Sequence, residues 1–266
     1  MDADLIARFA LDGRRAVVIG AGRGIGREIA IVLAKAGAAL VVADIDTAEL
    51  AVTVDAIHAA GAQVEAVPLD VRDREAVLAL GARADAGGGI DVWVNVAGVI
   101  SAANVADMAP EEYDRIVAVN MTGVYWGCAA AARIMTPRGR GSIVNISSTG
   151  ADVPSAGLSV YAMTKAAVNM LTRSLAHEVG PHGVRVNAVA PGFVDTPMVT
   201  YRFRDATGAI DERQKQAIFA ARADATVLKR VGTVEDIASA VLYLAADASA
   251  FVTGQILRPN GGLAMP

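Results

Sequence analysis

The sequence predicts an α/β fold in which a parallel β-sheet is covered by helices on both faces. Short apolar runs rich in valine and isoleucine, typical of strands buried on both sides, alternate with stretches of helical character. Such alternation specifies βαβ units and therefore parallel strands. Hydrophobic residues make up 54% of the 266-residue chain and charged residues 20%, which is enough apolar surface for a large core. One domain over residues 1–266 is the simplest organisation, because α/β folds often reach about 250 residues as a single unit.

Six parallel strands are expected from these apolar runs. In chain order they are Ala16–Ile19, Leu40–Ala43, Val64–Leu69, Val92–Val94, Ile143–Ile146 and Arg185–Val189. Helices between the first four strands are expected over Gly26–Ala36, Thr47–Ala60 and Asp73–Ala86. The longest uncharged stretch, Ile116–Ala132, falls just below membrane-spanning length and contains Asn120 and Thr122. A buried helix is the better interpretation of that stretch.

Composition indicates a cytoplasmic protein that acts on small molecules. The formal net charge is −4, the isoelectric point is about 5.4 and no dense run of lysine and arginine occurs, so the electrostatic signature of nucleic-acid binding is missing. Cys128 is the only cysteine, which excludes an internal disulfide, and the histidines form no recognisable metal-ligand cluster with it. The first residues lack the basic and then apolar pattern of a signal peptide, so no membrane association is expected.

A glycine-rich turn follows the first expected strand and leads into the first helix. Its residues, 20–26, are Gly-Ala-Gly-Arg-Gly-Ile-Gly. Glycines allow a tight turn and close approach of the backbone to a pyrophosphate, and a helix N-terminus offers unpaired N–H groups and the positive end of the helix dipole. In this strand–turn–helix context the motif predicts a dinucleotide site, with Gly20, Gly24 and Gly26 as its glycines.

Three charged residues bear on which dinucleotide is bound. Asp44 ends the second strand, eighteen residues after Gly26, where a carboxylate accepts both hydroxyls of an adenosine ribose and repels a 2′-phosphate. Arg23 in the turn could instead pair with such a phosphate. Because the repulsion by Asp44 is direct, NAD is favoured over NADP. Asp70 ends the third strand and either accepts from the adenine amino group or caps the helix that starts near Arg72.

The most informative motif combines Tyr161 and Lys165 with Ser148, which lies thirteen residues before the tyrosine. On a helix, the i,i+4 spacing places the phenol and the ammonium on one face. A free tyrosine titrates near ~10, and a fixed cation beside it favours the phenolate and lowers its pKa. A serine hydroxyl from a neighbouring strand end can then hold a substrate oxygen while the tyrosine exchanges a proton with it. The pair alone also occurs on surface helices without any catalytic role, so its meaning depends on the rest of the chain.

Taken together, these motifs resemble the classical short-chain dehydrogenase/reductase family. The residues that carry the resemblance stand in the family's order between about residues 11 and 263: the glycine turn, Asn95-Val-Ala-Gly98, Asn120, Ser148, Tyr161, Lys165 and Pro191-Gly192. The resemblance implies a Rossmann-type, doubly wound sheet of about seven strands, the last near Gly254–Leu257. It also implies an NAD(P)-dependent enzyme that acts on CH–OH groups and assembles as a homotetramer.

The resemblance further implies a role for each matching residue. Tyr161 would be the general acid/base, Lys165 would lower its pKa and bind the nicotinamide ribose, and Ser148 would orient the substrate oxygen. Asn120 would help to hold a proton-relay water. The other matches would bind the cofactor: Gly20, Arg23, Gly24, Ile25, Gly26, Asp44, Asp70, Val71, Asn95, Ala97 and Gly98 on the adenosine and pyrophosphate side, and Pro191, Gly192, Val194 and Thr196 beside the nicotinamide.

Alternatives accompany several of these roles. Instead of a functional role, Asn95 could have the purely structural role of stabilising the central sheet. In the same way, Asn120 could bond only to main-chain groups inside its helix, and Thr196 could only cap the next helix. Ser147 competes with Ser148 for the catalytic role, but Ser148 has the family's thirteen-residue separation, and Ser147 should point to the opposite side if the strand continues that far.

Three positions depart from the commonest family pattern. Ile19, Val96 and Asn260 stand where threonine, asparagine and aspartate are usual. The first two lie near the expected cofactor site, and we expect them to loosen hydrogen bonds of the sheet without touching the chemistry.

The expected activity is reversible hydride transfer between NAD(H) and a secondary alcohol or ketone. Substrate choice should depend on a lid over about residues 193–229, whose apolar and basic residues include Phe193, Met198, Tyr201, Arg202, Phe203, Arg204, Ile210, Arg213, Phe219 and Arg222. One alternative is an NADPH-dependent 3-oxoacyl-(acyl carrier protein) reductase. Asp44 disfavours NADPH, and the usual carrier-docking positions hold Gly139 and His182. Another alternative is a non-catalytic dinucleotide-binding protein.

Overall fold

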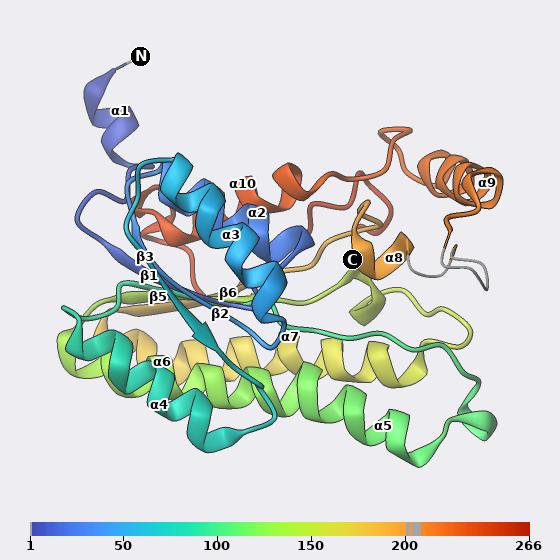
Figure 1. The fold of residues 1–266 in the computed structure, drawn as a ribbon, viewed down its shortest axis with the longest axis horizontal. Helices are drawn as coiled ribbons and strands as arrows, with labels where there is room; N and C mark the ends of the chain where they lie inside the picture. Colours follow the sequence, from blue (N-terminus) through green and yellow to red (C-terminus); the bar gives the residue numbers. More distant parts are fainter. Residues whose placement is uncertain (1, 201–202, 204–208) are drawn as a thin grey trace.

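The computed structural model describes residues 2–200, 203 and 209–266, and its strands form one parallel sheet between two layers of helices (Figure 1). The strand order is β3-β2-β1-β4-β5-β6-β7. The six strands expected from the apolar runs are confirmed with ends within two residues, and the seventh, expected from the resemblance, is a strand of two residues. The strands are β1 (Arg15–Ile19), β2 (Ala39–Asp44), β3 (Val64–Pro68), β4 (Val92–Asn95), β5 (Gly141–Ile146), β6 (Val184–Val189) and β7 (Ile256–Leu257).

Helices cover both faces of the sheet, as the alternation predicted. The upper layer in Figure 1 contains α2 (Gly24–Lys35), α3 (Thr47–Ala59) and α10 (Val234–Ala245). The lower layer contains α4 (Arg74–Ala86), α5 (Pro110–Val117), α6 (Val124–Arg138) and α7 (Ser159–Val179). Three further helices are α1 (Ala3–Ala7), α8 (Pro197–Thr200) and α9 (Glu212–Asp224). Within the described part of the chain, no helix has the length and apolarity needed to cross a membrane.

Two apolar cores follow from the alternation of side chains along each strand. Ala16 and Val18 of β1 pack with the upper layer of helices, whereas Val17 and Ile19 pack with the lower layer. All four side chains are buried. Because neither face of the sheet meets solvent, the strands appear in the sequence as continuous apolar runs.

The uncharged stretch expected as one buried helix is built from three consecutive segments. Helix α5 ends at Val117, the π-helical segment η2 (Ala118–Gly123) follows, and α6 begins at Val124. Its helical character is confirmed, but its burial is only partial: Asn120 is buried, whereas Tyr125 is half exposed. The sequence pattern did not distinguish a helix buried all round from one with an uncharged outer face.

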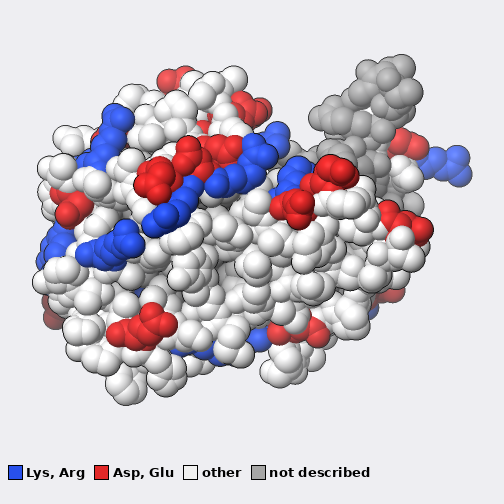
Figure 2. Space-filling view, turned by 90° about the horizontal axis from the view of Figure 1, so that it is seen from below, with Lys and Arg blue, Asp and Glu red and all other residues white. Residues whose placement is uncertain are grey.

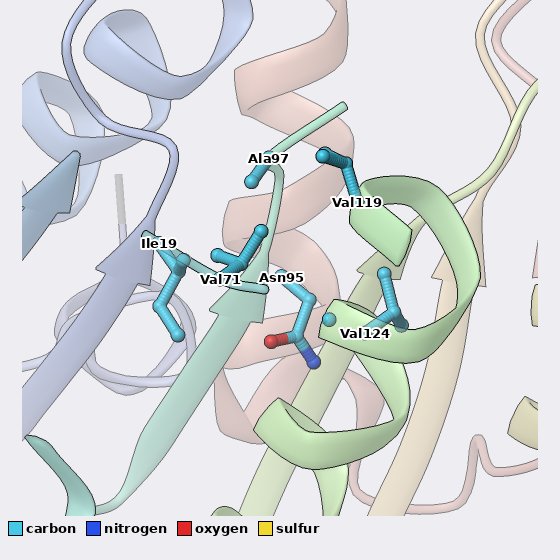
Figure 3. Close-up of a pocket in the computed structure, with 7 residues that line it drawn as sticks. Ile19, Val71, Asn95, Ala97, Val119 and Val124 are labelled. Atoms are coloured by element: carbon cyan, nitrogen blue, oxygen red, sulfur yellow. The ribbon is translucent and has the colours of Figure 1, made fainter. Parts of the chain in front are cut away.

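The sheet reverses its winding between β1 and β4. Strand β1 pairs with β2 on one side and with β4 on the other. Open α/β sheets bind ligands at such a point, beyond the carboxyl ends of the strands, because the connections there leave in opposite directions. Figure 3 shows a small cavity at this place, about 10 Å³ in volume, lined by Ile19, Val71, Asn95, Ala97, Val119, Gly123 and Val124.

Helix α6 lies so close to β4 that only glycine fits at position 127. A Cβ atom there would lie 2.1 Å from Oδ1 of Asn95, and that oxygen accepts a hydrogen bond from Trp93 inside the core. Gly180, at the end of α7, is also helical, but a Cβ atom at that position would have no atom of the surroundings within 4 Å.

We therefore predict different effects of two Gly→Ala substitutions. Gly127→Ala should lower the free energy of unfolding by about 1–3 kcal/mol, because the added methyl group must displace Asn95. Gly180→Ala should change that free energy by less than about 1 kcal/mol, because the entropy that alanine saves in a helix is offset by crowding against the next residue, Pro181. Urea unfolding followed by circular dichroism measures both. A Gly127→Ala variant as stable as the parent would contradict the close approach of α6.

Candidate active site

The glycine-rich turn lies against the end of β4. Gly20 has a φ angle of +87°, and a Cβ atom on it would lie 2.4 Å from the main-chain nitrogen of Ala97. A Cβ atom on Gly26 would lie 1.9 Å from the carbonyl oxygen of Gly20. Helix α2 begins at Gly24, two residues before the expected start, so its N-terminal N–H groups belong to the turn itself. The glycines therefore allow the turn, the start of α2 and the end of β4 to pack against one another more closely than side chains would permit.

Asp44 at the end of β2 holds this turn. One carboxylate oxygen accepts a hydrogen bond from the main-chain nitrogen of Gly22 (2.7 Å), and the other accepts from that of Asp46 (2.9 Å). Arg23 is the exposed N-cap residue of α2, and no ion pair joins it to any residue of the described chain. The carboxylate is thus fixed beside the turn, whereas the guanidinium of Arg23 extends into solvent.

Two residues that support the turn were not predicted from the sequence. The guanidinium of Arg27 donates to the carbonyl oxygen of Gly22 and to the carboxylate of Glu49. The buried Thr53 of α3 donates its hydroxyl hydrogen to the carbonyl oxygen of Ala21 (2.8 Å). Arg27 follows Gly26 directly and could have been noticed, whereas Thr53 lies in a helix whose sequence gives no sign of contact with the turn.

Asp70 does not cap a helix, so that alternative is wrong. Helix α4 begins later, and its N-cap is Asp73, whose side chain accepts from the N–H of Ala76. The carboxylate of Asp70 instead accepts from the guanidinium of Arg72, with Nε 3.0 Å and 2.9 Å from its two oxygens and Nη2 2.6 Å from one of them. These bonds lower the pKa of Asp70. Val71, which follows it, is buried and lines the cavity of Figure 3.

The side chain of Asn95 is used inside the protein. Its Oδ1 accepts from the indole N–H of Trp93 (2.8 Å), and its Nδ2 donates to Oδ1 of Asn145 (2.8 Å). Asn145 in turn donates to the hydroxyl of Thr172 on α7 (3.0 Å). Asn95 is 3% exposed, and Figure 3 shows its carboxamide directed towards α6. The alternative that Asn95 stabilises the central sheet therefore fits the structure better than direct contact with a cofactor.

Asn120 is fixed by the chain that follows β4. Its Oδ1 accepts from the N–H of Val99 (2.8 Å), and its Nδ2 donates to the carbonyl oxygen of Val99 (2.8 Å). A Cβ atom on Gly98 would lie 3.5 Å from Oδ1 of Asn120 and 3.6 Å from Nζ of Lys165. The structure thus brings together Asn120, the Gly98 loop and Lys165. The Asn120 side chain bonds to the main chain of Val99 and not to the main chain of its own helix.

The two adjacent serines after β5 point to different partners. Ser147 is buried and donates to the carbonyl oxygen of Lys165 (3.2 Å). The Ser148 hydroxyl accepts a hydrogen bond from the N–H of Gly150 (3.0 Å), and a Cβ atom on Gly150 would lie 3.4 Å from both that hydroxyl oxygen and Cε1 of Tyr161. Ser148 is therefore the serine that faces the tyrosine.

Lys165 lies beneath Tyr161, with Nζ 5.8 Å from the centre of the phenol ring. Its ammonium donates to the carbonyl oxygen of Ile146 (2.9 Å) and is 3% exposed as a residue. Burial lowers the pKa of Lys165 to about 8. Burial also raises the pKa of Tyr161, although the Ser148 side chain opposes this. Removal of the phenolate from water thus works against the lowering of the Tyr161 pKa that is expected from Lys165.

The segment after β6 runs from the neighbourhood of Ser148 back to the glycine turn. The carbonyl oxygen of Pro191 accepts from the N–H of Thr149 (3.0 Å), and the N–H of Gly192 donates to the carbonyl oxygen of Pro259 (3.2 Å). Val194 is buried. Thr196 precedes α8, and its Cβ lies 3.6 Å from where a Cβ atom on Gly24 would be. Residues 191–196 therefore border both ends of the expected cofactor site.

Aromatic contacts help to attach the expected lid. The rings of Phe193 and Phe219 meet edge to face at 5.3 Å, and Phe203 lies 6.3 Å from Phe219. Lys215 is 3.7 Å from the carboxylate of Asp195. No residue of α9 is buried. Tyr201, Arg202 and Arg204, which the sequence assigned to the lid, lie outside the described residues.

Comparison with known proteins agrees with this geometry. A family model described as enoyl-(acyl carrier protein) reductase matches residues 20–264. The chain is 38% identical to galactitol 2-dehydrogenase (L-tagatose-forming) of Cereibacter sphaeroides, with 96% of each chain covered.

Solved structures agree as well. A crystal structure of a short-chain type dehydrogenase/reductase from Mycobacterium marinum is 33% identical and has a TM-score of 0.89, covering 98% of this chain and 100% of that one. A gluconate 5-dehydrogenase from Burkholderia cenocepacia, in complex with NADP and tartrate, is 34% identical with a TM-score of 0.88, covering 97% of this chain and 98% of that one. The chain therefore belongs to the classical short-chain dehydrogenase/reductase family, whose members are NAD(P)-dependent oxidoreductases acting on CH–OH groups.

Proposed function

We propose that this enzyme uses NAD to oxidise a secondary alcohol reversibly to a ketone. The observation that carries the proposal is the cluster of Ser148, Tyr161 and Lys165, in which the serine hydroxyl and the phenol ring both border Gly150 and the ammonium lies 5.8 Å from the centre of the phenol ring. A hydroxyl, a phenol and an ammonium grouped in this way can hold an oxygen and move its proton.

The residues around the cluster fit a dinucleotide. The turn at Gly20–Gly26 would bind a pyrophosphate at the N-terminus of α2, where unpaired N–H groups are available, and the lack of a side chain at Gly26 lets the helix pack closely against the turn. Residues 191–196 would border the nicotinamide, and Lys165 would bind its ribose. Asp70 and Ala97 would lie on the adenosine side. When bound, the nicotinamide supplies the hydride chemistry.

Each catalytic residue then has a distinct task. Ser148 donates a hydrogen bond to the substrate oxygen and fixes its position. Tyr161 takes the hydroxyl proton during oxidation and returns it during reduction. Lys165, charged below a pKa of about 8, stabilises the phenolate while Tyr161 has given up its proton. Asn120 helps to hold a relay water that connects this site to solvent.

NAD is preferred over NADP because Asp44 already lies at the turn. Its carboxylate, bonded to the N–H of Gly22, would accept the ribose hydroxyls and repel a 2′-phosphate. The gluconate 5-dehydrogenase of similar structure holds NADP, which is the observation that stands against this preference. For NADP to be preferred here, Arg23 would have to bind the 2′-phosphate strongly enough to outweigh the repulsion by Asp44.

Polyols and sugar acids are the substrate classes to test first, since the relatives include dehydrogenases of galactitol and gluconate. A carrier-protein-linked reductase is less well supported. Arg138 and Arg140, which flank Gly139 at the usual docking positions, both lie near the carboxylate of Asp91, at 3.7 Å and 3.1 Å. A non-catalytic dinucleotide-binding role would not account for the grouping of Ser148, Tyr161 and Lys165.

We also propose a cytoplasmic homotetramer. Met163 and Met170 on α7 are each 58% exposed, and Tyr125 on α6 is 51% exposed. Figure 2, which views the molecule from below, shows wide uncharged areas between interleaved acidic and basic side chains. Uncharged surface of this kind is typical of contacts between copies of a chain.

Replacement of the proposed acid/base should stop the reaction without weakening cofactor binding. We expect Tyr161→Phe to lower kcat at least about 100-fold, because the proton acceptor is lost. The affinity for NADH should remain within about twofold, since the ring is retained. Turnover is measured with NAD and a panel of alcohols that includes galactitol and gluconate, and binding by NADH fluorescence. Tyr243→Phe on α10 is the matched control, and persistent turnover in Tyr161→Phe would exclude the mechanism.

Asp44 should determine the choice of dinucleotide. The parent is expected to bind NADH more tightly than NADPH, and Asp44→Asn should shift the affinity ratio towards NADPH by about tenfold or more, which corresponds to about 1.4 kcal/mol of removed repulsion. Asp46→Asn, two residues away, should leave the ratio unchanged. Tighter binding of NADPH by the parent in the fluorescence titration would show that Arg23 outweighs Asp44.

Burial of Lys165 predicts a characteristic dependence of stability on pH. Its pKa is about 8 in the folded protein and near 10.5 when exposed, so between these values the unfolded chain binds a proton that the folded protein lacks. The free energy of unfolding therefore rises with pH across this window. The stability contribution of neutral Lys165 is full above a pH of 10.5 and is lost as the pH falls through about 8. Relative to Lys165→Met, the parent should gain on the order of 3 kcal/mol across this window. Urea unfolding of both proteins at several pH values tests this, and a difference that is independent of pH contradicts it.

A further inference from the structure

A partly buried ion pair joins the chain just after Ser148 to the chain just after β7. Nε of Arg258 lies 2.8 Å from one carboxylate oxygen of Asp152, and Nη2 lies 3.1 Å from the other. The side chains are 23% and 12% exposed, and the partners are 106 residues apart in sequence. Two parallel hydrogen bonds of this kind fix orientation as well as distance.

Asp152 belongs to the short turn that carries the catalytic serine. Its N–H donates to the carbonyl oxygen of Thr149 (3.0 Å), and the N–H of Ala151 donates to that of Ser148 (3.0 Å). Ser148 itself accepts from Gly150 (3.0 Å). The position of the Asp152 side chain is therefore coupled to that of Ser148 through the hydrogen bonds of this turn.

Arg258 belongs to the segment that supports the nicotinamide side. The N–H of Ala190 donates to the carbonyl oxygen of Leu257 (2.7 Å), and the N–H of Gly192 donates to that of Pro259 (3.2 Å). The two bonds lie on either side of Arg258. Because Thr149 also donates to Pro191 (3.0 Å), three segments form a closed ring: the serine turn, residues 190–192 and residues 257–259. The ion pair is the side-chain link that closes it.

We propose that Asp152 and Arg258 are positioning residues that set the Ser148 hydroxyl against the segment bordering the nicotinamide. Neither residue touches substrate or cofactor in this proposal, which rests on the proposed function for Ser148. Their effect is on the distance between the group that holds the substrate oxygen and the surface that holds the hydride donor, a distance to which the rate is very sensitive.

Hydrogen exchange tests the mechanical part without any substrate. Asp152→Asn keeps the shape of the side chain but removes its charge, and it should increase amide exchange in a peptide spanning residues 147–153. The matched control is Asp247→Asn, which breaks another ion pair between distant segments, with Arg14 immediately before β1. That control should leave exchange in 147–153 unchanged. Unchanged exchange in Asp152→Asn overturns the proposal.

Kinetics test the catalytic part. With NAD and galactitol, or the panel alcohol that the parent oxidises fastest, Asp152→Asn should lower kcat about tenfold or more and leave the KM for NAD within about twofold. In a Ser148→Ala background the same substitution should lower kcat by less than about twofold, because no hydroxyl remains to be positioned. Asp152→Glu, which restores the charge, should recover part of the lost kcat.

Equal losses in the two backgrounds would mean that the pair only stabilises the fold, and would overturn the proposal. If Asp152→Asn does not fold, Arg258→Lys, which retains the charge but not the two-pronged contact, replaces it in both measurements. If the parent oxidises no alcohol, the proposed function fails, and hydrogen exchange alone then decides whether the pair holds the serine turn.

Discussion

Everything in this active site depends on the pairing of β1 with β4. Because β1 also pairs with β2, the connections that leave β1 and β4 must turn to opposite faces of the sheet, and the carboxyl ends of these two strands stay uncovered. The glycine turn occupies one side of this opening and the Gly98 loop the other, and they touch where Gly20 meets Ala97. Without this pairing the cradle for a dinucleotide and the residues from the later strands would not face one another.

A chain of buried polar side chains connects that opening to α7. Asn95 at the end of β4 bonds to Asn145 of β5, and Asn145 bonds to Thr172 of α7. Tyr161 and Lys165 stand on the same helix, so its depth and rotation relative to the strands are specified by directional bonds in addition to apolar packing. Polar groups inside a core define one arrangement better than methyl groups do, provided that all of them are bonded. Here they fix the helix that carries the proposed acid/base and its lysine.

The sequence predicted the strands, the strand–turn–helix motif and the grouping of Ser148 with Tyr161, because each of these depends on local pattern or on spacing along one helix. It failed where the outcome depended on long-range contacts. The destination of the Asn95 side chain is set by Trp93, Asn145 and a glycine of α6, which no local pattern reveals. The direction of the Tyr161 pKa shift is set by burial, which spacing alone does not report. Support of the turn by Thr53 was hidden for the same reason.

The weak attachment of α9 affects how enzymes of this family can evolve. A helix without buried residues, joined to the rest through a few aromatic rings and a lysine, contributes little to the stability of the sheet. Mutations in it can therefore accumulate without unfolding the protein, whereas mutations around β1 and β4 cannot. Under the proposal that α9 belongs to the substrate lid, substrate preference can thus change while the residues proposed for proton and hydride transfer stay constant.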